Sequence, residues 1–139
     1  LLARAILWCG ANPQCAGETF NVTNGDVLEW PSLFPAIADL FAMGAGEPEP
    51  MRLREAMPEL ASVWDDIVAE HDLRPITMQA LVGDSWQFAD AVFGYGGRAL
   101  STLVSTIKIR QFGFAECIDT EEMFAKQLRA LQRERILPL

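Results

Sequence analysis

The sequence has very few of the side chains on which common reaction classes depend. Its 139 residues include one histidine, His71, so a zinc site with two histidine ligands cannot form within one chain. The single tyrosine, Tyr95, is followed four residues later by Ala99 rather than by lysine. The sequence therefore lacks a Tyr-x-x-x-Lys pair, in which the lysine lowers the pKa of a tyrosine on the same helical face.

Cysteines and long apolar runs are also scarce. The cysteines Cys9, Cys15 and Cys117 are odd in number and have no C-x-x-C spacing, which argues against a secreted disulfide framework and predicts reduced thiols. No apolar run is long enough to cross a bilayer. The apolar start at residues 1–8 has no basic region before it and no initiator Met, so we interpret it as a helix from within a longer protein rather than a signal peptide. These features predict a cytoplasmic protein without a membrane partner.

Basic residues are fewer than acidic ones: the sequence has 11 Lys and Arg and 19 Asp and Glu, which gives a net charge of −8. An acidic surface repels phosphate backbones, so nucleic acid is not an expected partner. The one basic cluster, Arg129, Arg133 and Arg135, flanks Glu134 and is typical of the solvated end of a helix. The length and the half-apolar composition fit one globular domain.

Hydrophobic periodicity predicts a helix-rich chain. Helices are expected over residues 1–11, from Trp30 to Phe41, over 51–57, from Pro58 to His71, after the N-cap Thr77, over 86–93, over 105–113, and from the capping box at 119–122 onwards. Alternating β-branched residues predict a strand at 18–23, and a second strand or extended segment is expected at 99–104. A lone strand leaves its backbone groups unpaired, so we predict an α+β, predominantly helical fold whose strands need a larger sheet.

A glycine-rich segment, residues 94–99 (GYGGRA), matches the G-x-G-x-x-A pattern of a dinucleotide-binding turn. Glu116 lies about twenty residues after these glycines, at the spacing of the acid that binds the ribose in such sites. That mechanism, however, needs a strand before the glycines and a helix after them. Because residues 86–93 have a helical pattern, we favour a flexible connection. Paired acids such as Asp65 and Asp66 are typical of solvated helix faces rather than of acid–base catalysis.

Four blocks of the sequence resemble one group of enzymes. They are residues 17–30 (GETFNVTNGDVLEW), 63–68 (VWDDIV), 85–90 (SWQFAD) and 105–114 (STIKIRQFGF), followed by the DT pair at 119–120 and the ILP end at 136–138. In this order they resemble the C-terminal part of extended short-chain dehydrogenases/reductases of the NAD-dependent epimerase/dehydratase superfamily. They are most similar to the progesterone 5-beta-reductase/iridoid synthase-like enone reductases. The tryptophan-containing blocks are the more specific ones, and the resemblance covers nearly the whole chain.

The resemblance implies that the intact enzyme has a nucleotide-binding half and a substrate-binding lobe. An intact member has a Rossmann half with the glycine motif and the Tyr/Lys catalytic residues, binds NADP(H), and delivers hydride to an activated alkene or carbonyl. Residues 1–25 would be the terminal helix and strand of that nucleotide-binding half, and residues 26–139 the substrate-binding lobe. The resemblance implies substrate contacts for Phe88 and, more weakly, for Trp86, which could equally pack the lobe core. Ser105 and Lys108 match shared positions and are interpreted as a helix cap and a solvated base.

Several alternatives stay open at this point. We expect no catalytic residue and no metal ligand in this chain, and no cofactor bound by it alone. Since the apolar faces of residues 1–25 would be exposed, we expect either the missing N-terminal Rossmann half or a second copy as partner. A stand-alone binding or interaction module is the alternative from another class. A fragment of a nucleotide-sugar epimerase or dehydratase is a third, against which the acidic charge and the apolar Trp86 and Phe88 argue.

Overall fold

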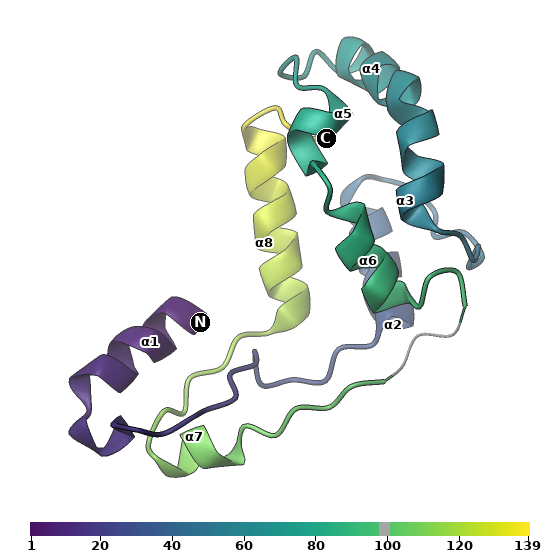
Figure 1. Ribbon diagram of the computed structural model, residues 1–139. Coiled ribbons are helices and arrows are strands. Elements are labelled where there is room, and N and C mark those ends of the chain that lie inside the picture. Colours follow the sequence, from purple (N-terminus) through teal and green to yellow (C-terminus); the bar gives the residue numbers. More distant parts are fainter. Residues whose placement is uncertain (98–100) are drawn as a thin grey trace. The chain divides into compact units, whose positions relative to one another are not determined.

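The computed structural model describes residues 1–97 and 101–139, and over these ranges the chain is mainly helical (Figure 1). In chain order the helices are α1 (Leu2–Ala11), the 3-10 helix η1 (Pro13–Cys15), α2 (Trp30–Leu40), α3 (Leu53–Ala56), the 3-10 helix η2 (Met57–Leu60), α4 (Ala61–Glu70), α5 (Met78–Val82), α6 (Trp86–Phe93), α7 (Ile107–Gln111) and α8 (Thr120–Arg133). Two predictions, the extended segment at 99–104 and the glycine motif at 94–99, lie partly outside the described residues.

The helices are confirmed where hydrophobic periodicity predicted them, with one correction to a boundary. A long helix was expected to begin at Pro58, but α4 begins at Ala61, and Pro58 lies inside η2. Proline has no backbone N–H to donate and crowds the preceding turn, which favours a short 3-10 turn between α3 and α4. The end of α4 falls at Glu70, next to His71, as predicted.

Local helix caps follow the sequence. The hydroxyl of Thr77 accepts a hydrogen bond from the Ala80 amide at 3.2 Å at the start of α5. The carboxylate of Asp119 accepts one from the Glu122 amide at 2.8 Å at the start of α8. Both bonds satisfy backbone donors that a first helical turn leaves without a partner.

The strand predicted at residues 18–23 does not form. In Figure 1 this segment is an extended stretch that follows α1 and η1, and no strand is assigned within residues 1–97 and 101–139. A strand is defined by a hydrogen-bonded neighbour, and the described chain supplies none. Side chains hold the segment instead: Lys108 Nζ binds the Thr19 carbonyl at 3.0 Å and the Glu18 carboxylate at 2.7 Å, and Asn21 Nδ2 donates to the Ser105 carbonyl at 3.1 Å.

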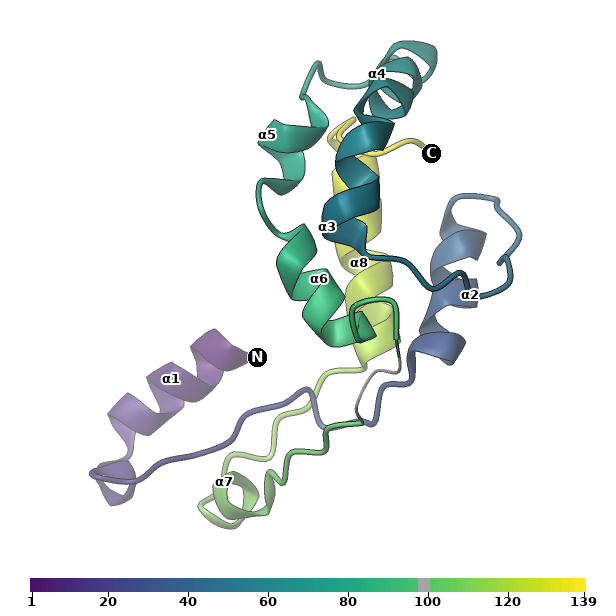
Figure 2. The ribbon, with the colours of Figure 1, turned by 45° about the vertical axis from the view of Figure 1, so that its right-hand side comes forward.

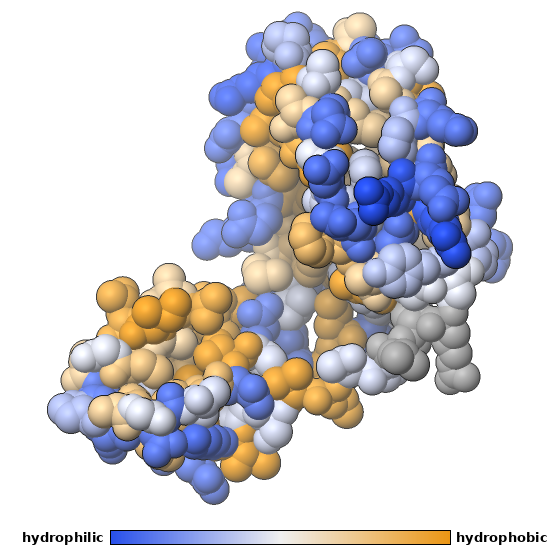
Figure 3. Space-filling model, viewed as in Figure 1, coloured by the Kyte–Doolittle hydropathy of each residue, from blue (hydrophilic) through white to orange (hydrophobic). Residues whose placement is uncertain are grey.

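The chain divides into two compact units, of which unit 1 comprises Leu1–Ile37 and Thr102–Lys126. Its core consists of Ala5, Ile109 and Phe114, against which the half-buried Leu1, Trp8, Phe20 and Val22 pack. The rings of Trp8 and Phe114 lie 5.5 Å apart. The opposite face of α1 is exposed: Leu2, Ile6 and Leu7 are 61%, 63% and 73% accessible. Figure 3 shows the hydrophobic surface that results over α1.

Unit 2 comprises Ala38–Ser101 and Gln127–Leu139. Helix α3 packs against α6, and α4 packs against α5; α3 and α6 lie side by side in Figures 1 and 2. The indole of Trp64 donates to the Ile76 carbonyl at 2.7 Å and so ties α4 to the segment before α5. The buried Gln132 donates to the carbonyls of Leu40 at 3.2 Å and Pro138 at 2.8 Å, which fastens α8 to the end of α2 and to the C-terminal segment.

Among the described residues, no helix combines the length and the apolar composition needed to span a membrane.

Candidate functional site

The most exposed aromatic side chain on a helix of unit 2 is Phe88 of α6. It is 67% accessible, and Val92, four residues later on the same helical face, is 48% accessible. We call Phe88 and Val92 the α6 face. Tyr95, which follows the helix with a φ of 56°, is 55% accessible. The α6 face is thus an apolar surface that carries a residue predicted from the sequence as a substrate contact.

Trp86 opens α6 and is half-buried. Residues two apart on a helix point to different sides, so Trp86 and Phe88 do not share a face. The structure therefore sets Phe88 beside Val92 rather than beside Trp86. Val92 was not singled out from the sequence as a site residue, although its i, i+4 spacing from Phe88 was a readable signal.

The inward side of α6 carries a buried carboxylate, Asp90, which is 3% accessible. One of its oxygens accepts from the Leu53 amide at 2.7 Å and the other from the Arg54 amide at 3.1 Å. Both amides belong to the first turn of α3, so Asp90 is a cap supplied from a distant segment. The sequence placed Asp90 in a resemblance block but gave no indication of this role.

A second distant carboxylate, Asp26, caps α8 in unit 1. Its two oxygens accept from the backbone amide and from the hydroxyl of Thr120, each at 2.7 Å. These hydrogen bonds from the Thr120 side chain and backbone lower the pKa of Asp26 from its ordinary value of 3.8. The carboxylate is thus held in its charged form, in a structural role at the start of α8.

The cysteines are free thiols. Cys15 is buried at the end of η1, and burial raises its pKa, to which the neighbouring Cys9 adds. A raised pKa keeps Cys15 a neutral thiol at neutral pH, which makes it a poor nucleophile. Within the part of the chain that the structure describes, no group of three or more His, Cys, Asp or Glu side chains is placed to hold a metal ion.

The glycines at 94 and 96 allow backbone conformations that other residues rarely adopt. Gly94 ends α6 in the left-handed region, and Gly96 also has a positive φ, of 78°. A Cβ on Gly96 would meet the Met51 backbone at 3.3 Å, so this glycine permits a close chain crossing. The glycines follow helix α6 rather than the strand that precedes a dinucleotide-binding turn. Glu116, the acid that matched the ribose-binding spacing, pairs with Arg4 at 2.7 Å.

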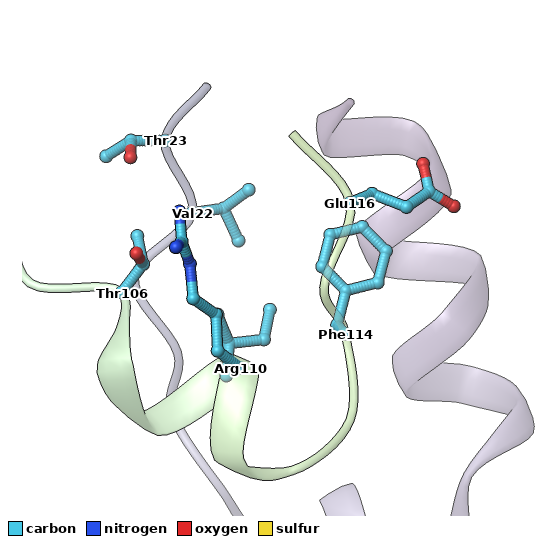
Figure 4. A pocket seen from close by; sticks show the side chains of 7 residues that line it. Val22, Thr23, Thr106, Arg110, Phe114 and Glu116 are labelled. Atoms are coloured by element: carbon cyan, nitrogen blue, oxygen red, sulfur yellow. The ribbon is translucent and has the colours of Figure 1, made fainter. Parts of the chain in front are cut away.

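Two hollows lie in unit 1. One, of about 10 Å³, has room for no more than a single water molecule. Figure 4 shows its lining, in which Val22, Thr23, Thr106, Arg110, Phe114 and Glu116 are labelled. A broader hollow of about 440 Å³ has a mixed lining of acidic, hydroxyl and apolar residues: Asp26, Val27, Leu28, Glu29, Ser32, Leu33, Asp119, Thr120 and Glu121. Phe88 and Trp86 line neither of them.

The two shared positions interpreted as structural do act structurally. The Ser105 hydroxyl accepts from the Ile107 amide at 3.4 Å at the start of α7. Lys108 is more than a solvated base: besides its bonds to Glu18 and Thr19, its ammonium lies 5.2 Å from the centre of the Phe20 ring. Ser105 and Lys108 thus take part in contacts within unit 1, whereas the α6 face is an exposed apolar surface.

No family model matches the chain. The chain is 33% identical over 141 residues to an (S)-8-oxocitronellyl enol synthase of Antirrhinum majus, an alignment that covers 99% of the chain and 35% of that protein. It is 28% identical over 141 residues to the enol synthase ISY2 of Nepeta racemosa, covering 99% of the chain and 34% of the relative. It is 26% identical over 141 residues to a 3-oxo-Delta(4,5)-steroid 5-beta-reductase of Arabidopsis thaliana, covering 99% and 35%.

The chain thus spans about a third of the length of the curated relatives it matches. It is homologous, over nearly all of its own length, to the C-terminal part of the iridoid synthase and progesterone 5-beta-reductase-like short-chain dehydrogenases/reductases.

Proposed function

We propose that the chain is the substrate-binding, C-terminal part of an NADP(H)-dependent oxidoreductase that reduces an activated alkene or carbonyl of a small apolar substrate. The observation that carries this proposal is the alignment of 99% of the chain with an enol synthase and with a steroid 5-beta-reductase. The comparisons favour a reductase parent over a nucleotide-sugar epimerase, because the relatives reported above are named as enol synthases and as a steroid reductase.

Phe88 is the proposed substrate contact, and the exposed α6 face supports this assignment. Covering a largely exposed phenylalanine with an apolar ligand is favourable by up to about 1.5–3 kcal/mol. Val92 would extend the same surface. Trp86 is proposed as a weaker contact, because it is half-buried on another side of α6.

The chemistry is proposed to reside outside this chain. The sequence has no Tyr-x-x-x-Lys pair, and its glycine motif follows helix α6 rather than a strand. A nucleotide-binding half would bind NADP(H), which supplies the hydride, and would carry the catalytic tyrosine and lysine. The chain alone would then bind substrate weakly and turn none over.

The apolar face of α1 is proposed to lie against that nucleotide-binding half. Residues 1–25 would be its terminal helix and strand, and residues 26–139 the substrate-binding lobe. Two observations support this: Leu2, Ile6 and Leu7 are exposed together, and the extended segment at 18–23 pairs with no strand among the described residues. In the structure, residues 1–25 belong to unit 1 together with residues 102–126. The proposed boundary at residue 25 therefore divides the whole enzyme by function and differs from the boundary between the two units. The free cysteines fit a cytoplasmic location.

A chimera tests the proposal directly. The chain replaces the matching third of the Arabidopsis 3-oxo-Delta(4,5)-steroid 5-beta-reductase, and NADPH consumption is measured with a 3-oxo-Delta(4,5)-steroid. We expect turnover by the chimera and none by the isolated chain. In the chimera, Phe88→Ala should lower kcat/KM by about ten-fold or more, which corresponds to the loss of about 1.4 kcal/mol of transition-state binding. The matched control is Leu60→Ala, which removes an exposed apolar side chain from η2.

A second measurement separates this function from a stand-alone binding module. The isolated chain is titrated with the same steroid, and the quenching of its tryptophan fluorescence is recorded with and without the nucleotide-binding half of the reductase. Tight binding by the isolated chain, unchanged by adding that half, would favour the binding module. Binding and turnover that appear only with the half present would support the enzyme.

A further inference from the structure

Asp90 and Phe88 lie on the same helix but point to opposite sides. They are two residues apart, which is about 200° around an α-helix. Asp90 is 3% accessible and Phe88 is 67% accessible. The rotation of α6 about its axis therefore decides both positions at once, and any rotation that brings Phe88 inwards takes Asp90 outwards.

Hydrophobicity alone does not fix the rotation of α6, because apolar side chains lie on both of its sides. Trp86, Ala89 and Phe93 are half-buried, whereas Phe88 and Val92 are exposed. Apolar contacts are non-directional, so they tolerate a range of helix rotations. A directional interaction can fix one rotation within that range.

The cap that Asp90 supplies to α3 is such an interaction. Both of its oxygens are used, by the amides of Leu53 at 2.7 Å and Arg54 at 3.1 Å. The bonds are charge-assisted and directional, and they would be lost if α6 turned. The main chain of the same residue ends the helix, because the Asp90 carbonyl accepts from the amides of Gly94 and, at 2.8 Å, Tyr95. Asp90 is thus fixed through its side chain and its backbone.

We propose that Asp90 is a positioning residue for the substrate contact: by capping α3 it sets the rotation of α6 and holds Phe88 outwards, where a substrate can reach it. The inference rests on the proposed role of Phe88. Asp90 itself touches no substrate. It acts through α6, and its effect should therefore appear in the position of the Phe88 ring and in substrate affinity.

Fluorine NMR reads that position without any substrate. 4-Fluorophenylalanine is incorporated at position 88 of the 139-residue chain, and the change in its ¹⁹F shift between H₂O and D₂O reports solvent contact. The unsubstituted chain should show the large isotope shift of an exposed ring. Asp90→Ala should lose part of that shift, because α6 is then free to turn about its axis and the ring spends less time in contact with water. Asp84→Asn removes an exposed carboxylate just before α6 and should leave the shift unchanged.

Circular dichroism establishes that each variant is folded. If Asp90→Ala does not fold, Asp90→Asn decides, because it keeps the shape of the side chain and one accepting oxygen. It should show a partial loss of the isotope shift. A folded Asp90 variant whose Phe88 shift matches that of the unsubstituted chain would overturn the proposal.

The reductase chimera supplies the functional reading. There Asp90→Ala should raise KM for the 3-oxo-Delta(4,5)-steroid by about ten-fold while changing kcat less, and Asp90→Asn should restore part of the affinity. A chimera with no steroid reduction would contradict the proposed function while the fluorine shifts still decide the role of Asp90. If the chimera were active but neither the fluorine shift nor KM changed in the Asp90 variants, the positioning role would be refuted and the proposed function would stand.

Discussion

Helices α1 and α6 each have one packed side and one exposed apolar side, but their packed sides are held differently. Helix α1 is held by apolar contacts, with Ala5 and Trp8 packed against Ile109 and Phe114. Helix α6 is held in part by the buried carboxylate of Asp90, which caps α3. Apolar contacts are strong and non-directional, whereas hydrogen bonds to a carboxylate have a fixed geometry.

This difference bears on what each exposed face requires. An apolar surface that docks onto a large partner needs area more than an exact angle, and α1 offers Leu2, Ile6 and Leu7. A side chain that contacts a small substrate needs a defined position. The comparison therefore associates the apolar attachment with the proposed docking helix and the directional attachment with the proposed substrate helix.

The largest expected effect tests the apolar attachment of α1. Phe114→Ala removes a side chain that is 5% accessible and packs on Trp8, and it should lower the free energy of unfolding by about 3–5 kcal/mol. Urea denaturation followed by tryptophan fluorescence measures this change. Ile107→Ala on α7, where the side chain is 64% accessible, should cost at most about 1 kcal/mol. Equal losses would show that the contact between α1 and Phe114 does not stabilise unit 1.

The next effect tests the polar attachment of α6. Asp90→Ala leaves two amides of α3 without their acceptor and should lower the free energy of unfolding by about 1.5–3 kcal/mol. Hydrogen exchange should become faster at the amides of Leu53 and Arg54. Asp84→Asn serves as the control. An Asp90→Ala chain with native protection at both amides would contradict the cap.

A smaller effect depends on pH and concerns Asp26, the exposed cap of α8, in contrast to the buried cap Asp90. Asp26 has a folded-state pKa below its ordinary value of 3.8, so it favours the folded chain when ionised. That contribution is complete above the unfolded-state pKa and is lost as the pH falls through the lower, folded-state pKa. Between about pH 6 and about pH 3, the unsubstituted chain should lose more unfolding free energy than Asp26→Asn does. Asp65→Asn should behave like the unsubstituted chain. If Asp26→Asn lost as much unfolding free energy as the unsubstituted chain, Asp26 would not contribute to the pH dependence.

The smallest effect on stability concerns the exposed faces themselves. Leu7→Lys should change the free energy of unfolding by no more than about 0.5 kcal/mol, because the side chain is 73% accessible. It should nevertheless weaken binding of the nucleotide-binding half of the reductase, measured by titration calorimetry, and reduce the fluorescence of an apolar dye. Phe88→Ala should leave that binding unchanged. If both substitutions weakened it equally, the two faces would not have separate roles.

Much of the helical structure could be predicted because it depends on neighbours in the sequence. The apolar spacing within α2, α4 and α6 and the caps Thr77 and Asp119 act over one or two turns, so short stretches specify them. The strand expected at 18–23 was wrong because a strand depends on a partner that local residues cannot supply. The positions of Phe88 and Trp86 as substrate contacts stay predictions, since they came from a resemblance.

The sequence by itself determined which segments become helices, the absence of a Tyr-x-x-x-Lys pair, and the likeness to the C-terminal part of a reductase. Only the tertiary structure decided that Asp26 caps α8, that Asp90 caps α3, and that Phe88 is left outside. The physical reason is that a cap of this kind joins a carboxylate to amides of a segment far away in the chain. Its geometry exists only once both segments have packed, and no local pattern encodes it.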